Sequence, residues 1–65
     1  MSLTEMQLKV LRCICEGDTS SDISEKVFLS KRRIDGIRLE IYKATGTKSV
    51  AQLVRWAVRN EIIKP

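Results

Sequence analysis

The sequence predicts an all-α fold of four helices, because of its apolar spacing, its capping residues and its lack of strand patterning. Apolar side chains recur three and four residues apart through most of the chain, and no segment alternates for long enough to predict a strand. The 65 residues suffice for one small domain, which buries only ~60% of the surface of its unfolded chain. Start and stop signals place the helices at residues 5–16, 20–27, 31–45 and 50–60.

The first predicted helix has a start signal, an apolar face and a stop signal. Thr4 is its N-cap and Gln7 at N3 completes a capping box, while Leu3 is placed to pack onto Leu8. Gly17 favours the left-handed conformation that ends many helices. The residues expected to face the core are Leu8, Leu11, Ile14 and Cys15.

The second predicted helix is short. Thr19 caps it with Asp22 at N3, and both Ile23 and Val27 are expected to face the core. Only residues 28–30 separate it from the next predicted helix. This is the spacing of a helix-turn-helix, a motif whose second helix enters the major groove of DNA.

The third predicted helix carries three adjacent cations in its first turn, at residues 31–33. Ser30 is its N-cap, Leu29 is placed to pack onto Ile34, and Gly46 ends it. Its core face is expected to consist of Ile34, Ile37 and Ile41.

The fourth predicted helix begins at Ser49, with Gln52 as the N3 partner of a capping box, and runs to about Asn60. Beyond it, Ile62 and Ile63 are expected to pack back on the core. The residues expected to be buried by this helix are Val50, Leu53, Val54 and Ala57.

Charge is distributed unevenly between the two halves of the chain. Residues 1–30 carry three cationic and five anionic side chains, a net charge of −2, whereas residues 31–65 carry nine and three, a net charge of +6. A small domain with its positive charge gathered in one half is typical of a nucleic-acid binder. Charge alone leaves open the alternative of a solvated basic surface without a partner.

One face of the third helix, opposite its isoleucines, is the candidate surface for reading bases: Arg32, Asp35, Gly36, Leu39 and Lys43. Arg32 can bind a guanine edge with two hydrogen bonds, and Leu39 can contact a thymine methyl group. Asp35 either accepts a hydrogen bond from a cytosine amino group or forms an ion pair with an arginine at position 32, 33 or 38. Gly36 either allows close approach to a partner or is a glycine tolerated on a solvated face.

A second set of residues is predicted to contact DNA phosphates, which position a protein on the duplex without specifying sequence. Cations near both ends of the third helix suit this role, and the free N–H groups at the start of the second helix favour an anion. Any one of these side chains is alternatively a solvated surface group, but we expect three or more contacts from the set. Its members are Thr19, Ser20, Ser30, Lys31, Arg33, Arg38 and Lys48, with Lys43 a candidate for either role.

Other chemistry has little support in the sequence. Cys13 and Cys15 lie two residues apart on one helix, so their side chains diverge and free thiols are expected. The chain has no histidine and no CxxC motif, so no metal or other cofactor is predicted. The sequence has neither a pair of acidic residues placed for catalysis nor a Gly-rich phosphate loop, so an enzyme is not predicted. No apolar stretch approaches the ~20 residues of a membrane span and no signal peptide is present, so a cytoplasmic location is expected.

The chain resembles the LuxR-type (GerE-like) helix-turn-helix domain, the output half of many bacterial response regulators and quorum sensors. The resemblance covers essentially the whole chain and is carried by Leu3-Thr4, Leu8, Val10-Leu11, Gly17, Ile23, Leu29-Ser30, Ile34, Ile41, Gly46 and Val54. It implies that the third helix reads the major groove and that the fourth commonly pairs in a dimer. The chain departs from the family pattern at Met6-Gln7, Arg33, Asp35, Ile37 and Ala44, so the base specificity of relatives does not transfer.

We therefore expect a sequence-specific binder of double-stranded DNA that acts in a bacterial transcription regulator. A weak homodimer through the fourth helix is expected, anchored by Trp56, which the helical spacing places away from the buried face. The alternative for Trp56 is packing flat on the surface of its own domain. The predicted pairing surface consists of Gln52, Arg55, Trp56 and Arg59.

Two further alternatives concern the class of protein and the extent of the regulator. A helical protein-interaction module, docking a partner through Leu39 and Trp56, is the alternative function, whereas RNA binding has little support because there are few aromatic side chains. The resemblance implies a preceding sensory or receiver domain, and Met1-Ser2 looks like an expression start ahead of an excised segment. A complete small regulator is the other possibility.

Overall fold

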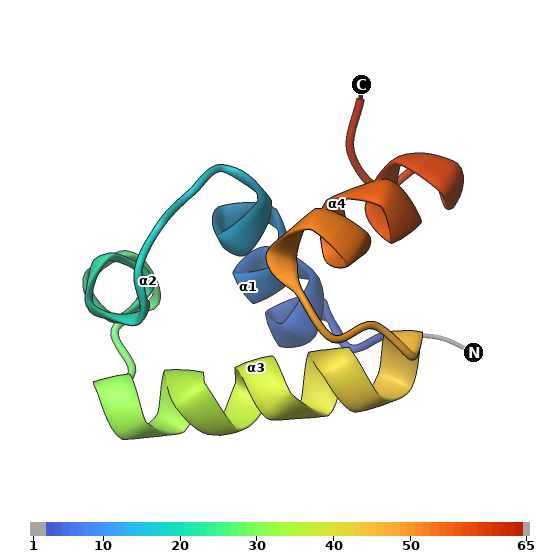
Figure 1. The fold of residues 1–65 in the computed structure, drawn as a ribbon. Coiled ribbons are helices and arrows are strands. Elements are labelled where there is room, and N and C mark those ends of the chain that lie inside the picture. The colour runs from blue at the N-terminus through green and yellow to red at the C-terminus, as the bar shows by residue number, and fades with distance from the viewer. Residues whose placement is uncertain (1–2, 65) are drawn as a thin grey trace.

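Figure 1 shows the computed structural model, which describes residues 3–64. It contains four helices: α1 (Glu5–Cys15), α2 (Ser20–Val27), α3 (Lys31–Thr45) and α4 (Val50–Arg59). No strand occurs among the described residues, so the predicted all-α fold is confirmed, with helix bounds that agree to within one residue. The interpretation of Met1-Ser2 concerns residues outside the described range. None of the helices within residues 3–64 is long and apolar enough to span a membrane.

The long helix α3 organises the fold, because it packs against each of the other three helices. In Figure 1 it runs along the lower side of the molecule, with α1 and α4 above it and α2 above its N-terminal end. One side of α3 therefore faces its own domain, and the opposite side is left uncovered by the described residues.

Nine buried apolar residues among residues 3–64 form the core, and they are drawn from all four helices. Ile34, Ile37 and Ile41 form the predicted inner face of α3 and are at most 1% exposed. Burying an isoleucine contributes roughly 1.5–3 kcal/mol, so these residues make α3 a central element of stability. The other buried residues are Val10, Leu11, Ile14, Ile23, Leu53 and Ala57.

The inner face of α1 differs from the predicted one. Val10 is fully buried, whereas Leu8 and Cys15, both predicted to face the core, are only half-buried. Val10, Leu11 and Ile14 share one arc of the helix, and Leu8 and Cys15 lie together at one edge of that arc. The prediction for Leu8 was therefore wrong, because the helix is rotated toward Val10.

Two predictions of burial on α4 were also wrong. Val50 is 42% exposed because it lies in the first turn, at the end of the helix, and Val54 is only half-buried. Trp56, predicted to be exposed, is half-buried and packs against the core. The loop that joins α3 to α4 lies beside it, since residues 45–47 and Trp56 border the same hollow. This is the alternative in which Trp56 packs on its own domain.

The predicted N-caps are confirmed, and they explain where the helices begin. Thr4 accepts a hydrogen bond from the Gln7 N–H at 3.1 Å, and the Gln7 side chain accepts one from the Thr4 N–H at 2.9 Å. Thr19 and Asp22 form the same reciprocal pair, and Ser30 and Ser49 each accept from the N–H three residues on. The box at Ser49 is incomplete, because Oε1 of Gln52 accepts instead from the Lys48 N–H at 2.8 Å.

The chain leaves its helices through left-handed residues. Gly46 ends α3 with φ 69°, as predicted, and Gly17 follows α1 with φ 93°. Glu61 has φ 59° after α4, which turns the chain so that Ile62 donates to the Ala57 carbonyl at 2.8 Å. Ile62 and Ile63 consequently pack against the core, as predicted.

Candidate nucleic-acid interface

The outer face of α3 presents the residues predicted to read bases. Arg32, Asp35 and Lys43 are exposed, Leu39 is 68% exposed, and Gly36 is half-buried. A Cβ atom placed on Gly36 would meet no described atom within 4 Å, so nothing in residues 3–64 requires a glycine there. The five residues lie together on the side of α3 away from its buried isoleucines. We call this set the reading face.

Asp35 has a partner that the sequence did not predict. Its Oδ1 accepts a hydrogen bond from Oγ of Ser20, in the first turn of α2, at 2.6 Å. Within the described residues, the only ion pair joins Lys26 to Asp18, so Asp35 is not paired with any arginine. The ion-pair alternative for Asp35 was therefore wrong, and the carboxylate links α3 to α2 instead.

The cations predicted to contact phosphates form no ion pair in the part of the chain described by the structure. Lys31, Arg33 and Lys48 are exposed and Arg38 is half-buried. Their charges are therefore available to an external anion. Ser30 serves as the N-cap of α3, since its Oγ accepts from the Arg33 N–H at 3.1 Å.

The start of α2 is less favourable for binding an anion than the sequence predicts. Thr19 and the carboxylate of Asp22 form the capping box, and the Ser20 hydroxyl hydrogen is directed to Asp35. The hydrogen bond from the Thr19 backbone, followed by that from the Thr19 side chain, holds the pKa of Asp22 below its ordinary value. Two carboxylates therefore lie near this N-terminus, where a phosphate would also be directed.

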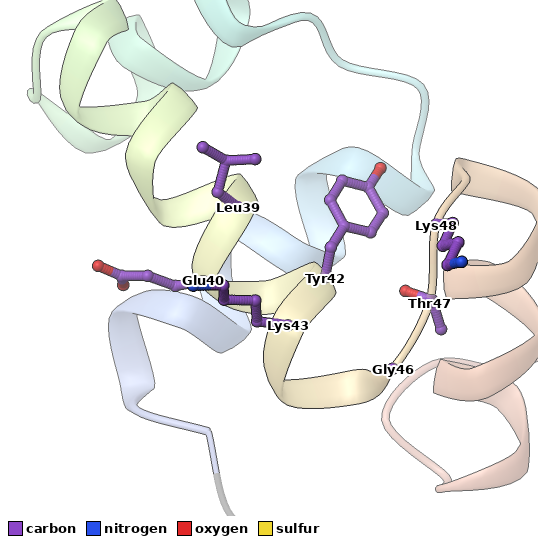
Figure 2. A pocket seen from close by; sticks show the side chains of 7 residues that line it. All are labelled: Leu39, Glu40, Tyr42, Lys43, Gly46, Thr47 and Lys48. Carbon is purple, nitrogen blue, oxygen red and sulfur yellow. The ribbon is translucent and has the colours of Figure 1, made fainter.

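A hollow of about 470 Å³ lies between the second half of α3 and the loop that follows it. Figure 2 shows Leu39 and Lys43 of the reading face at its border, together with Thr47 and Lys48 of the loop. Tyr42, half-buried on α3, also lines it and was not singled out from the sequence. The loop thus brings Lys48 next to the C-terminal part of the reading face.

The predicted pairing surface is only partly exposed. Gln52, Arg55 and Arg59 are exposed, whereas Trp56 is half-buried. All four border one hollow of about 400 Å³ with residues 45–47. Arginines therefore dominate the exposed part of this surface.

A separate group of possible metal ligands lies at the C-terminal end of α1 and just after it. The ligand atoms of Cys13, Glu16 and Asp18 lie within 4.8 Å of one another. The ammonium group of Lys26 is 2.5 Å from Asp18 Oδ2, so one of the three ligand groups is already paired with a cation. Burial raises the pKa of both Cys13 and Cys15, which are free thiols.

Comparison with known proteins places the fold and its basic helix in a family. Residues 1–57 match the family model described as bacterial regulatory proteins, luxR family (GerE). The chain belongs to the LuxR family. The resemblance noted from the sequence is thus confirmed, and it includes all of α1, α2 and α3.

Two curated relatives of this LuxR-family chain are bacterial regulators. The DNA-binding transcriptional activator EvgA of Escherichia coli (strain K12) is 31% identical over 61 residues, which are 94% of this chain and 30% of EvgA. The oxygen regulatory protein NreC of Staphylococcus aureus (strain JH9) is 27% identical over 62 residues, which are 95% of this chain and 29% of NreC. The chain therefore spans about 30% of the length of these relatives. No solved structure matches the chain.

Proposed function

We propose that this domain binds double-stranded DNA in a sequence-specific manner, as the output domain of a bacterial transcription regulator. The observation that carries the proposal is the two-sided character of α3. Its inner face is formed by buried isoleucines, and its outer face and ends carry cations without partners among the described residues. A helix supported from behind in this way can enter the major groove without disturbing the core.

The reading face supplies the base contacts in this proposal. Arg32 forms a bidentate contact with a guanine edge, Leu39 contacts a thymine methyl group, and Lys43 reaches a base at the far end of the helix. The open space beside Gly36 allows the backbone of α3 to approach the floor of the groove. Asp35 reads a base amino group.

Phosphate contacts orient the domain on the duplex. Lys31 and Arg33 lie in the first turn of α3, Arg38 lies at its middle, and Lys48 lies beyond its end. Cations spread in this way can contact the phosphates of both DNA strands that border the groove. Ser30, Thr19 and Ser20 are the polar members of the set, although the two carboxylates near Thr19 and Ser20 weaken the electrostatic attraction there.

Two copies are expected to pair weakly through α4 on adjacent half-sites about one helical turn apart. Arg55 and Arg59 repel their copies across a two-fold axis, while the accessible part of Trp56 supplies apolar contact. Pairing is therefore expected mainly when DNA, or a preceding sensory or receiver domain, holds two copies together. The regulator is expected to act in the cytoplasm, without catalytic chemistry and without a cofactor.

A salt titration of DNA affinity tests the proposal against a helical protein-interaction module. If about five phosphates are neutralised, the logarithm of affinity falls with the logarithm of salt concentration at a slope between about −4 and −5. The measurement is fluorescence anisotropy of a labelled duplex at increasing salt concentration. A slope near zero, or no binding at low salt, would contradict DNA binding and favour the interaction module.

A further inference from the structure

The hydrogen bond between Ser20 and Asp35 joins the two helices of the helix-turn-helix on its DNA-facing side. Ser20 lies in the first turn of α2, and Asp35 lies on the reading face of α3, fifteen residues further along the chain. The Ser20 hydroxyl donates to Oδ1 of Asp35 at 2.6 Å. A donor on a separate helix therefore restricts the orientation of a carboxylate that is otherwise exposed.

This hydrogen bond uses only part of the accepting capacity of the carboxylate. An ionised carboxylate offers about four lone-pair sites on two oxygens. Within residues 3–64, Oδ2 of Asp35 accepts no side-chain hydrogen bond and the carboxylate forms no ion pair. One oxygen is thus held by Ser20, and the other remains free to accept a hydrogen bond from a ligand.

The chemistry of the major groove selects the base that suits such an acceptor. Guanine presents two acceptors and thymine presents one, so both repel a carboxylate. Adenine presents an amino donor next to the N7 acceptor, whereas the donor of cytosine has no acceptor beside it on the same base. A carboxylate therefore favours cytosine.

We propose that Ser20 and Asp35 together form a pre-oriented acceptor for the amino group of one cytosine in the operator. Asp35 is the specificity-determining residue, and Ser20 is a positioning residue that acts through it. Ordering the carboxylate before binding reduces the entropy that the contact costs, and it opposes rotation of Asp35 away from nearby phosphates. This inference rests on the proposed binding of DNA by α3.

The test is selection of preferred sites from a random duplex library, followed by affinity measurements on single-base-pair variants of the selected duplex. The wild-type chain should prefer C·G at one position by on the order of tenfold, and Asp35→Ala should lose that preference at that position only. Asp35→Asn can still accept from Ser20 but presents an amide donor to the groove. It should therefore shift the preference at that position from cytosine to a base that offers an acceptor.

Variants of Ser20 test the positioning role separately. Ser20→Ala should reduce the preference for cytosine several-fold while other positions of the site are unchanged, and Ser20→Thr, which retains a hydroxyl, should restore it. Ser21→Ala is the matched control, because Ser21 lies in the same turn, is exposed and forms no side-chain hydrogen bond within the described residues. Circular dichroism of each variant establishes that it is folded.

Three outcomes would overturn the inference. An unchanged site preference in Asp35→Ala would leave the hydrogen bond with a role only in packing α2 on α3. Tighter binding of that variant to all sequences alike would indicate that Asp35 faces phosphates. A Ser20→Ala variant with the wild-type preference would remove the positioning role. Absence of DNA binding by the wild-type chain would instead contradict the proposed function itself, so the two failures are distinguishable.

Discussion

The hydroxyl group of Ser24 donates a hydrogen bond to the backbone carbonyl of Leu29, across the turn that joins α2 to α3. The turn between them contains Phe28, whose backbone is left-handed, with φ 59° and ψ 39°. The Phe28 side chain is 91% exposed, so burial does not compensate for this conformation. The helix-turn-helix is therefore held in shape by neighbouring contacts, and Phe28 itself adds strain.

Phe28→Gly should stabilise the domain by about 0.5–1 kcal/mol. A left-handed backbone costs a residue with a side chain about 1–2 kcal/mol, and glycine avoids this cost. Glycine also makes the unfolded chain more flexible, which lowers the gain in stability by roughly 0.5–1 kcal/mol. Urea denaturation of the two proteins measures the difference in free energy of unfolding. Phe28→Ala is the control, because alanine retains the unfavourable backbone and should not stabilise. Equal gains in both variants would show that loss of the exposed ring, and not the backbone, is responsible.

The capping box of α2 should make stability depend on pH in the acid range. The pKa of the Asp22 carboxyl lies below its ordinary value of 3.8, chiefly because of the hydrogen bond from the Thr19 backbone. As the pH falls, the unfolded chain therefore binds a proton at Asp22 before the folded chain does. The contribution of Asp22 to the free energy of unfolding is present above the ordinary pKa of 3.8 and is lost as the pH falls through the lower pKa of the folded state. Urea denaturation between pH 5 and pH 2 measures the loss.

Asp22→Asn is the comparison for this prediction, since an amide can still accept from Thr19 but does not titrate. The variant should lose less stability than the wild type over the same pH range. Identical pH dependence in the two proteins would contradict the assignment to Asp22.

Lys31→Ala and Lys48→Ala should each weaken DNA binding to a similar extent for all sequences. Loss of one phosphate contact should also reduce the steepness of the salt dependence by about one unit of slope. Lys64→Ala is a matched control, because Lys64 is exposed and belongs to the segment that follows α4. Figure 1 shows this C-terminal segment on the side of the molecule away from α3. An equal effect of Lys64→Ala would indicate that only net charge matters.

Substitutions on α4 should separate folding from pairing. Trp56→Ala should destabilise the domain by about 2 kcal/mol, because the side chain packs against the core and truncation leaves a cavity.

Arg55→Gln should leave stability nearly unchanged and increase the fraction of two-to-one complexes on a duplex with two half-sites, since it removes like-charge repulsion. Analytical ultracentrifugation with and without DNA measures the stoichiometry. A decrease in pairing for Arg55→Gln would place Arg55 in an attractive contact.

The local signals in the sequence predicted most of the fold. Thr4, Thr19 and Ser30 each precede the helix that they cap, because capping involves residues only three apart. The isoleucines of α3 are spaced so that a single helical face accounts for them. Such features depend on neighbours along the chain and not on the arrangement of the helices.

Three of the errors arose where distant segments meet. Trp56 was predicted to be exposed from the spacing of α4 alone, but the loop before that helix lies beside it. The partner of Asp35 is on another helix, at Ser20, so helical spacing on α3 could not identify it. Leu8 and Val10 are both apolar, and only the packing of α1 on its neighbours decides which of them is buried.

The division of α3 into an inner and an outer face has a consequence for how such a regulator can diversify. The contribution of α3 to the buried core comes from Ile34, Ile37 and Ile41. The opposite side of the helix exposes Arg32 and Leu39. Substitutions at these outer positions alter the DNA sequence preferred in the proposed function but leave the folding free energy nearly unchanged. After gene duplication, two copies can therefore acquire different target genes through a few surface changes, without first passing through an unstable ancestor.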